Sequence, residues 1–116
     1  MENTVYYLKT CDTNKRIMKD LGLNTGFILR EIKSNQITPS ELDEMKDLAG
    51  SYAALFSKRS RQFGALGLQD KSLEEKDFKE LILKEYTFLK RPVTIFNDEI
   101  FIGNAKSEID RLRAKL

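Results

Sequence analysis

The sequence predicts an α/β protein with a four-stranded mixed sheet flanked by helices and a helical insertion over about residues 38–90. Hydrophobic runs of strand length lie near both ends of the chain, and the first two enclose a stretch with helical spacing. Two capping-box patterns in the middle indicate helices there. A strand, helix, strand unit normally forms a parallel pair, so the predicted order is βαβ, the insertion, then ββα.

The N-terminal unit begins with Val5–Leu8, a short aromatic and β-branched run between polar residues, which predicts a buried strand. The helix expected over Asn14–Leu21 carries its apolar side chains on one face and ends at Gly22. A second strand is expected over Phe27–Ile32.

The insertion opens with Thr38, Pro39 and Glu41, which supply a cap, a first-turn proline and a capping-box glutamate for a helix. Gly50 and its neighbour should break or kink this helix, after which residues 52–56 continue the helical spacing. Residues 58–67 are expected to form a basic loop with glycine turns.

A second capping box, Ser72 with Glu75, should open a helix that buries Phe78, Leu81 and Ile82 and ends before Arg91 and Pro92.

Two strands are expected near the C-terminus, Val93–Phe96 and Glu99–Ile102, joined by a two-residue turn at Asn97 and Asp98. A terminal helix should start at Ser107 with Asp110 in its first turn. Its apolar stripe is expected to contain Ile109, Leu112 and Leu116.

The composition, with 41% hydrophobic and 33% charged residues in 116, predicts one globular domain over residues 1–116. The net charge of +2 predicts no nucleic-acid partner. No run reaches the ~20 apolar residues of a membrane helix, and residues 1–4 lack the start of a signal peptide, so we expect a cytoplasmic protein with no membrane partner. Without histidine, no metal site and no Cys-His pair are expected.

Cys11 is the only cysteine, and it lies where the first strand gives way to the first helix. Unpaired N–H groups at a helix N-terminus stabilise a thiolate, and Lys9, Lys15 and Arg16 add positive charge nearby. A lone cysteine is more often a small buried residue, but the polar and basic neighbours favour a reactive thiol here. One cysteine cannot form an internal disulfide.

Three motifs, taken with the predicted element order, resemble the arsenate reductase family of ArsC, Spx and YffB proteins, which have a thioredoxin-like fold. They are Tyr7-Leu8-Lys9-Thr10-Cys11-Asp12-Thr13-Asn14-Lys15, Leu55-Phe56-Ser57-Lys58-Arg59 and Leu89-Lys90-Arg91-Pro92-Val93. The resemblance runs from Val5 to about Ile109. The cysteine motif is closest to the YffB branch, which is associated with glutathione-dependent thiol reduction. Spx regulators typically have a second cysteine where this chain has Asn14.

The resemblance implies that Cys11 is the nucleophile, that Arg59 and Arg91 hold an oxyanion, and that Pro92 is cis and packs against the sulfur. Glutaredoxin-coupled arsenate reductases have a third anion-binding arginine after the last strand, whereas residues 102–105 here are Ile-Gly-Asn-Ala. This difference favours a substrate other than arsenate.

The residues themselves support anion binding without choosing the anion. Thr13 and the backbone N–H groups of residues 13 and 14 can donate to a sulfur or an oxyanion, with Lys9 and Lys15 adding charge. An arginine fork suits glutathione and arsenate equally. The alternatives are a solvated basic loop around Arg59, where Lys58 or Arg61 could face the site instead, and ordinary surface charge at Arg91.

We therefore expect a single-cysteine oxidoreductase with no bound cofactor and with glutathione as co-substrate. Its substrate would be a small-molecule thiol compound or an oxyanion, and glutaredoxin or another thiol protein could be its partner. The alternative is a non-enzymatic partner-binding or regulatory module that uses residues 58–61 and 74–79 as contact surfaces.

Overall fold

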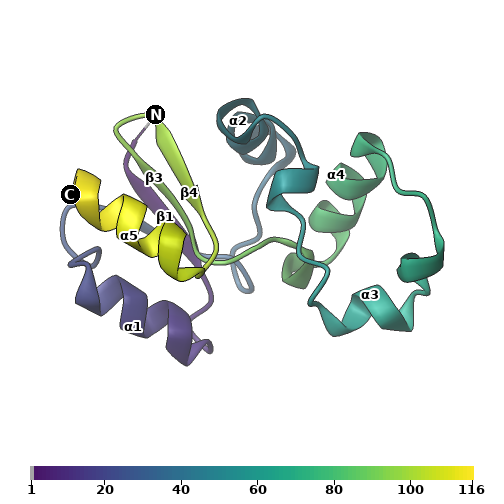
Figure 1. The fold of residues 1–116 in the computed structure, drawn as a ribbon, viewed down its shortest axis with the longest axis horizontal. Coiled ribbons are helices and arrows are strands. Elements are labelled where there is room, and N and C mark those ends of the chain that lie inside the picture. Colours follow the sequence, from purple (N-terminus) through teal and green to yellow (C-terminus); the bar gives the residue numbers. More distant parts are fainter. Residues whose placement is uncertain (1) are drawn as a thin grey trace. The chain divides into compact units, whose positions relative to one another are not determined.

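The computed structural model describes residues 2–116 and divides into two compact units. The first unit takes the two ends of the chain, up to Asn35 and from Arg91, and the second is Gln36–Lys90. In Figure 1 the purple and yellow ends of the chain form the sheet and two helices, and the teal and green middle is helical. The second unit corresponds closely to the segment expected as a helical insertion.

The first unit holds a four-stranded sheet in the order β2-β1-β3-β4. Its strands are β1 (Thr4–Tyr7), β2 (Ile28–Glu31), β3 (Val93–Phe96) and β4 (Glu99–Ile102). β1 and β2 are parallel and the other two pairs are antiparallel, which confirms the predicted mixed sheet. The strands of the C-terminal hairpin have the predicted bounds.

The turn of that hairpin has positive φ at Asn97 (49°) and Asp98 (63°). A two-residue turn with both residues in the left-handed region matches the twist of the flanking strands. Asn and Asp tolerate this conformation better than other non-glycine residues, which explains why the prediction from the sequence is correct.

Helices α1 (Asp12–Asp20) and α5 (Lys106–Lys115) pack on one face of the sheet. Val5 of β1 and Phe101 of β4 point to the same face because each is paired with Thr94. Both join one buried cluster with Met18 of α1 and Leu112 of α5. This cluster packs α1 and α5 against that face of the sheet.

Two helix predictions in this unit need correction. α1 begins at Asp12 rather than Asn14, because Cys11 already has the extended conformation of an N-cap (φ −98°, ψ 109°). α5 begins at Lys106, so Ser107 is not its cap. Leu116 was expected in the apolar stripe but is 47% exposed, because the helix ends at Lys115.

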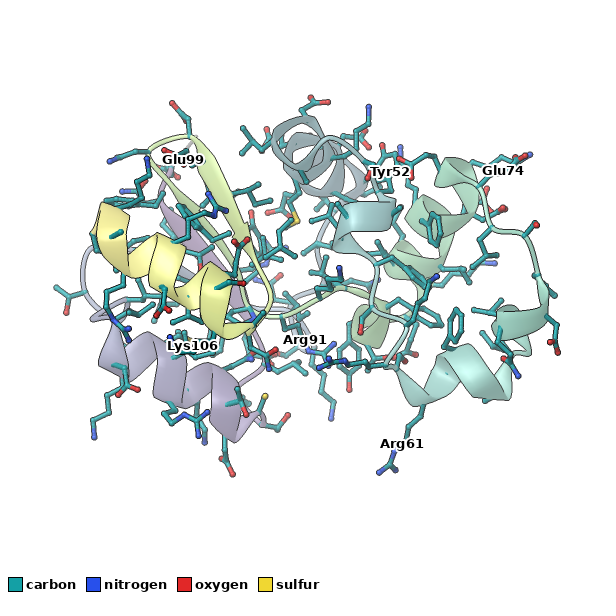
Figure 2. All side chains as sticks on the ribbon, viewed as in Figure 1. Tyr52, Arg61, Glu74, Arg91, Glu99 and Lys106 are labelled. Atoms are coloured by element: carbon teal, nitrogen blue, oxygen red, sulfur yellow. The ribbon has the colours of Figure 1, made fainter. Side chains whose placement is uncertain are left out.

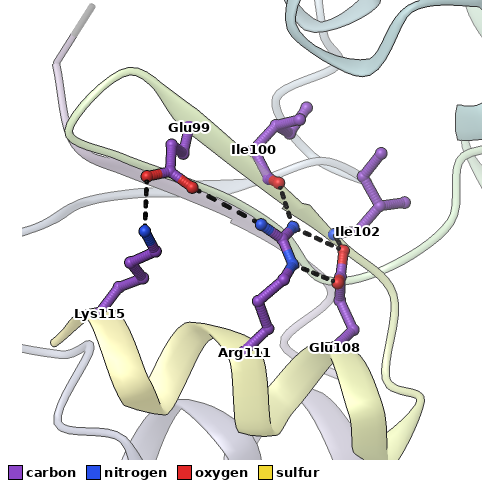
Figure 3. A network of polar contacts seen from close by, with 6 residues as sticks. All are labelled: Glu99, Ile100, Ile102, Glu108, Arg111 and Lys115. Atoms are coloured by element: carbon purple, nitrogen blue, oxygen red, sulfur yellow. Dashed lines mark hydrogen bonds and ion pairs between the residues drawn. The ribbon is translucent and has the colours of Figure 1, made fainter.

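A polar network joins α5 to the edge strand β4 (Figure 3). The Arg111 guanidinium donates to the Ile100 carbonyl at 2.7 Å, and a Glu108 carboxylate oxygen accepts from the Ile102 N–H at 2.8 Å. Arg111 also donates to Glu108 at 2.9 Å and lies over the Phe101 ring at 4.1 Å. Edge strands expose such backbone groups to other chains, so these side chains cover part of the edge.

In the second unit, α2 (Pro39–Ala49) has the predicted capping box. The Thr38 hydroxyl accepts from the Glu41 N–H at 3.1 Å, and the Glu41 carboxylate accepts from the Thr38 N–H at 2.8 Å. Gly50 ends the helix in the left-handed region with φ 95°. The unit continues through the 3₁₀ turn η1 (Ala53–Leu55), α3 (Arg61–Ala65), η2 (Leu68–Asp70), α4 (Glu75–Lys84) and η3 (Tyr86–Phe88).

The start of α4 was predicted wrongly. Its capping box is Glu74 with Asp77, not Ser72 with Glu75. The Glu75 carboxylate instead accepts from the backbone N–H groups of Tyr52 (2.7 Å) and Ala53 (3.0 Å), so it is not free to cap its own helix.

The same two bonds cap η1, which is a single 3₁₀ turn and not the expected continuation of helical spacing over residues 52–56. The predicted basic loop over residues 58–67 is also wrong, because the Ser60 hydroxyl accepts from the Gln62 N–H and starts α3.

Aromatic side chains form the core of the second unit. The Phe56 ring lies 5.0 Å from that of Phe88, 4.8 Å from Phe78 and 6.1 Å from Phe63, measured between centroids. None of the described helices combines the length and apolar character needed to cross a bilayer.

Candidate functional site

The candidate site is built around a turn between β1 and α1, residues 8–11, which we call the cysteine turn. The Cys11 N–H donates to the Leu8 carbonyl at 3.1 Å, and the Cys11 carbonyl accepts the first helical bond, from the Lys15 N–H at 3.2 Å. The thiol is free and partly exposed. Cys11 is therefore the N-cap residue of α1, one position before the helix.

This position places the cysteine beside backbone donors. The N–H groups of residues 12–14 precede the first helical bond, and a helix geometry leaves such groups without a partner inside the helix. α1 has nine residues, so its dipole adds positive potential at this end. Both effects favour a thiolate or a bound anion here.

The lysines expected at the site are exposed. The Lys15 ammonium lies 3.7 Å from the Asp12 carboxylate, and these side chains are 57% and 100% exposed. Such a pair is screened by water, and Asp12 offsets part of the charge of Lys15. Lys9 is exposed as well. The fixed N–H groups at the start of α1 should therefore contribute more to the positive potential at Cys11 than either lysine does.

Asn14 is almost fully buried, at 1% exposure, and its side-chain oxygen accepts from the Leu8 N–H at 3.0 Å. This bond ties the end of β1 to the first turn of α1. Thr13, partly buried, is the second residue of the helix. Of the two predicted donors, Asn14 therefore offers an anion its backbone N–H, while its side chain holds the cysteine turn.

The register of the sheet brings Arg91 and Pro92 to the same end of the sheet as the cysteine turn. Tyr6 pairs with Val93 in antiparallel orientation, so the residues after β1 and those before β3 extend beyond the same end. The Arg91–Pro92 peptide bond is cis, which is the geometry that the resemblance implies. Figure 2 shows Arg91 where the chain enters β3.

The residues after β4 also lie at this end, because the Gly103 N–H donates to the Pro92 carbonyl at 2.8 Å. Gly103 has φ 85°, and the next residues are Asn104 and Ala105. Residues 102–105 thus contain no counterpart of the third anion-binding arginine that the resemblance leads one to look for after the last strand.

Arg59 belongs to the second unit, in the exposed turn between η1 and α3 that also carries Lys58. The Ser57 N–H donates to the Phe88 carbonyl at 2.7 Å, on one side of this turn. On the other side, the hydroxyls of Ser60 and Thr87 lie 2.7 Å apart. These contacts hold the turn from both sides. Arg61 opens α3 and projects away from the helix in Figure 2.

A further residue at the cysteine turn, Glu31, was not predicted from the sequence. One of its carboxylate oxygens accepts from the Lys9 N–H at 3.2 Å, and the other accepts from Lys33 and Ser34. Partial burial raises the pKa of Glu31, but the bonds from Ser34, Lys9 and Lys33 outweigh it and hold the pKa below its ordinary value. Within the described residues, no group of acidic or cysteine side chains is arranged to hold a metal ion.

Comparison with known proteins identifies the class. A four-stranded mixed sheet with helices in this order is the thioredoxin-like fold of ArsC structures. The ArsC family model matches residues 6–112. The chain therefore belongs to the ArsC family, as the motifs around Cys11, Arg59 and Arg91 predict.

Solved structures share the fold over nearly the whole chain. A Bacteroides fragilis protein described as ArsC family related has a TM-score of 0.79 and 22% identity, covering 97% of this chain and 98% of its own. A YffB protein has a TM-score of 0.78 and 22% identity over 97% and 96%. An arsenate reductase from Vibrio cholerae has a TM-score of 0.75 and 17% identity over 100% and 98%. A search of curated proteins finds no match.

Proposed function

We propose that this protein is a thiol-dependent oxidoreductase in which Cys11 attacks the substrate and glutathione regenerates it. The observation that carries the proposal is the placement of a partly exposed free thiol at the N-cap of α1, in a chain of the ArsC family. The similarity to a solved arsenate reductase and to a YffB protein supports the same class of chemistry.

The first step is an attack by the Cys11 thiolate on the glutathionyl sulfur of a mixed disulfide. An S–S bond forms to Cys11, the original S–S bond breaks, and the other thiolate leaves with the electron pair and takes a proton from water. Glutathione then attacks the glutathionyl sulfur on Cys11 and releases the cysteine thiolate. One mixed disulfide and one glutathione become one free thiol and one glutathione disulfide.

Arsenate is the second substrate class for the same nucleophile. Its reduction to arsenite takes two electrons and removes one oxygen. Two glutathione thiols supply the electrons as they form a disulfide, the oxygen leaves as water with two protons, and Cys11 returns unchanged. The glycine, asparagine and alanine at 103–105, where arsenate reductases of the glutaredoxin-coupled type have an arginine, favour the disulfide over arsenate.

In this proposal the N–H groups of the first turn of α1, including those of Thr13 and Asn14, stabilise the thiolate. Arg91, at the same end of the sheet as the cysteine turn, holds a carboxylate of glutathione or an oxygen of an oxyanion, and the family resemblance assigns the same role to Arg59. Glutaredoxin or another thiol protein could replace glutathione in the second step. A free thiol with this role belongs in a reducing compartment, which favours the cytoplasm.

A turnover assay tests the proposal. The reduced protein is supplied with glutathione and either a small glutathionyl mixed disulfide or arsenate, and oxidised glutathione is measured. We expect turnover of the mixed disulfide that disappears in Cys11→Ser. Equal rates for wild type and Cys11→Ser with both substrates would leave a partner-binding module as the better account.

Arginine variants test the binding roles in the same assay. Arg59→Ala and Arg91→Ala should each raise KM by about tenfold, because each removes a charge-assisted bond to the substrate. Arg61→Ala, which removes an equal charge from the neighbouring helix, is the matched control and should leave KM within about twofold. An equal effect of Arg59→Ala and Arg61→Ala would reject Arg59 as a binding residue.

A further inference from the structure

We infer that Glu31 is a positioning residue for Cys11: its carboxylate fixes the peptide plane that holds the cysteine turn. The expected effect of Glu31 on the reaction rate of Cys11 rests on the proposed function. Glu31 ends β2, far from Cys11 in the sequence, and its contact with Lys9 spans 22 residues of chain.

The coupling passes through one peptide unit, the one between Leu8 and Lys9. Its N–H, on Lys9, donates to Glu31 at 3.2 Å. Its carbonyl, on Leu8, accepts from the Cys11 N–H at 3.1 Å. The peptide bond is planar and its N–H and C=O point in opposite directions, so fixing one group fixes the other. Glu31 therefore sets the direction of the acceptor that binds the Cys11 backbone.

The neighbouring peptide is held in the same manner. The Leu8 N–H donates to the buried side-chain oxygen of Asn14 at 3.0 Å. Two successive N–H groups of the cysteine turn thus have side-chain acceptors, one from α1 and one from β2. These bonds leave the cysteine turn less conformational freedom than an ordinary exposed loop has. A nucleophile held in a fixed orientation toward its target reacts faster.

Glu31 itself is anchored independently of the cysteine turn. The oxygen that does not bind Lys9 accepts from the Lys33 N–H (3.0 Å), the Ser34 N–H (2.9 Å) and the Ser34 hydroxyl (2.8 Å). Three donors on one oxygen hold the carboxylate in place, and the second oxygen is left for Lys9. One carboxylate oxygen therefore anchors Glu31, and the other binds the cysteine turn.

This division allows a specific variant. Glu31→Gln keeps one oxygen, which is best placed toward the three donors of residues 33 and 34. Its NH₂ group then faces the Lys9 N–H, and two donors cannot bond to each other. Ser34→Ala is the matched control, because it removes one donor from the anchoring oxygen and leaves the Lys9 bond intact.

Two measurements test the inference. Amide hydrogen exchange at Lys9 and Cys11, followed by NMR, should be about tenfold faster in Glu31→Gln and within about twofold of wild type in Ser34→Ala. The rate at which Cys11 forms a mixed disulfide with oxidised glutathione should fall about tenfold in Glu31→Gln only. Thermal unfolding of both variants shows that they are folded.

An unchanged exchange rate at Cys11 in Glu31→Gln would overturn the inference, and so would an unchanged mixed-disulfide rate. Equal effects of Glu31→Gln and Ser34→Ala would show a general structural role and would also overturn it. If wild type forms no mixed disulfide, the proposed function fails, and the exchange rate at Cys11 then decides the inference by itself.

Discussion

At the scale of single residues, the chemistry of Cys11 depends on the backbone around it. The thiol lies at the N-cap of α1, and the lysines near it in sequence are exposed and partly offset by Asp12. Exposed side-chain charges are screened by salt, whereas N–H groups held at the start of a helix can donate hydrogen bonds directly to a thiolate or a bound anion. The residues that orient this backbone should therefore matter more than the lysines.

Asn14→Ala tests whether the side chain of Asn14 stabilises the cysteine turn. The variant leaves the N–H of buried Leu8 without its side-chain acceptor, and we expect a loss of roughly 1–3 kcal/mol in the free energy of unfolding. Urea denaturation measures it. Lys15→Ala, one position further in an exposed site, should change the free energy by less than about 0.5 kcal/mol. Equal stability of Asn14→Ala and wild type would contradict the assigned bond.

At the scale of elements, α5 is joined to the edge strand β4 by groups that are ionised at neutral pH. The bond from Arg111 lowers the pKa of Glu108, burial raises it, and the Ile102 N–H lowers it further, so the pKa lies below its ordinary value. A carboxylate with a lowered pKa stabilises the fold above its unfolded pKa, and this contribution is lost as the pH falls through its folded pKa.

We therefore expect Glu108→Gln to reduce the free energy of unfolding at pH 7 and to differ less from wild type as the pH falls to about 3. Urea titrations at several pH values measure the difference. Glu80→Gln, at an exposed position of α4, controls for the loss of one negative charge. A Glu108→Gln deficit that stays constant across this range would show that ionisation of Glu108 is not involved.

The elements also show what a sequence can and cannot predict. The hairpin was predicted with the observed bounds because its alternation and its Asn97-Asp98 turn are local signals. The start of α4 was not, because Glu75 binds backbone groups of η1 more than 20 residues away. Local capping patterns compete with such distant contacts, which cannot be read from spacing.

In the candidate site, too, local motifs could be predicted from the sequence and distant contacts could not. Its motif residues, including Cys11, Arg91 and Pro92, could be proposed from the sequence because they lie in short motifs of a known family. Glu31 could not, since its contact with Lys9 exists only once β2 pairs with β1 in the observed register. The side-chain bond of Asn14 likewise depends on how α1 follows the end of β1.

At the scale of the whole molecule, the first unit is discontinuous in sequence, because Gln36–Lys90 lies between β2 and β3. Pairing β1 with β3 requires the chain to close over this segment, and the entropy cost of closure is larger when the segment is unfolded and flexible. The folded second unit should therefore support the sheet through chain connectivity.

Phe56→Ala tests this coupling. The variant removes the ring at the centre of the aromatic core and should destabilise the second unit by roughly 3–5 kcal/mol. We expect faster amide exchange in β1 and β3 as well, measured by NMR. Exchange in these strands at the wild-type rate, with faster exchange confined to residues 36–90, would show that the units unfold independently.

In the proposed reaction Cys11 forms a covalent intermediate that an outside thiol resolves. Intact-mass spectrometry after treatment with oxidised glutathione detects this intermediate. We predict one glutathionyl adduct on wild type, none on Cys11→Ser, and release of the adduct when reduced glutathione is added. An unmodified wild-type mass, or an adduct that reduced glutathione does not remove, would show that Cys11 does not work in this way.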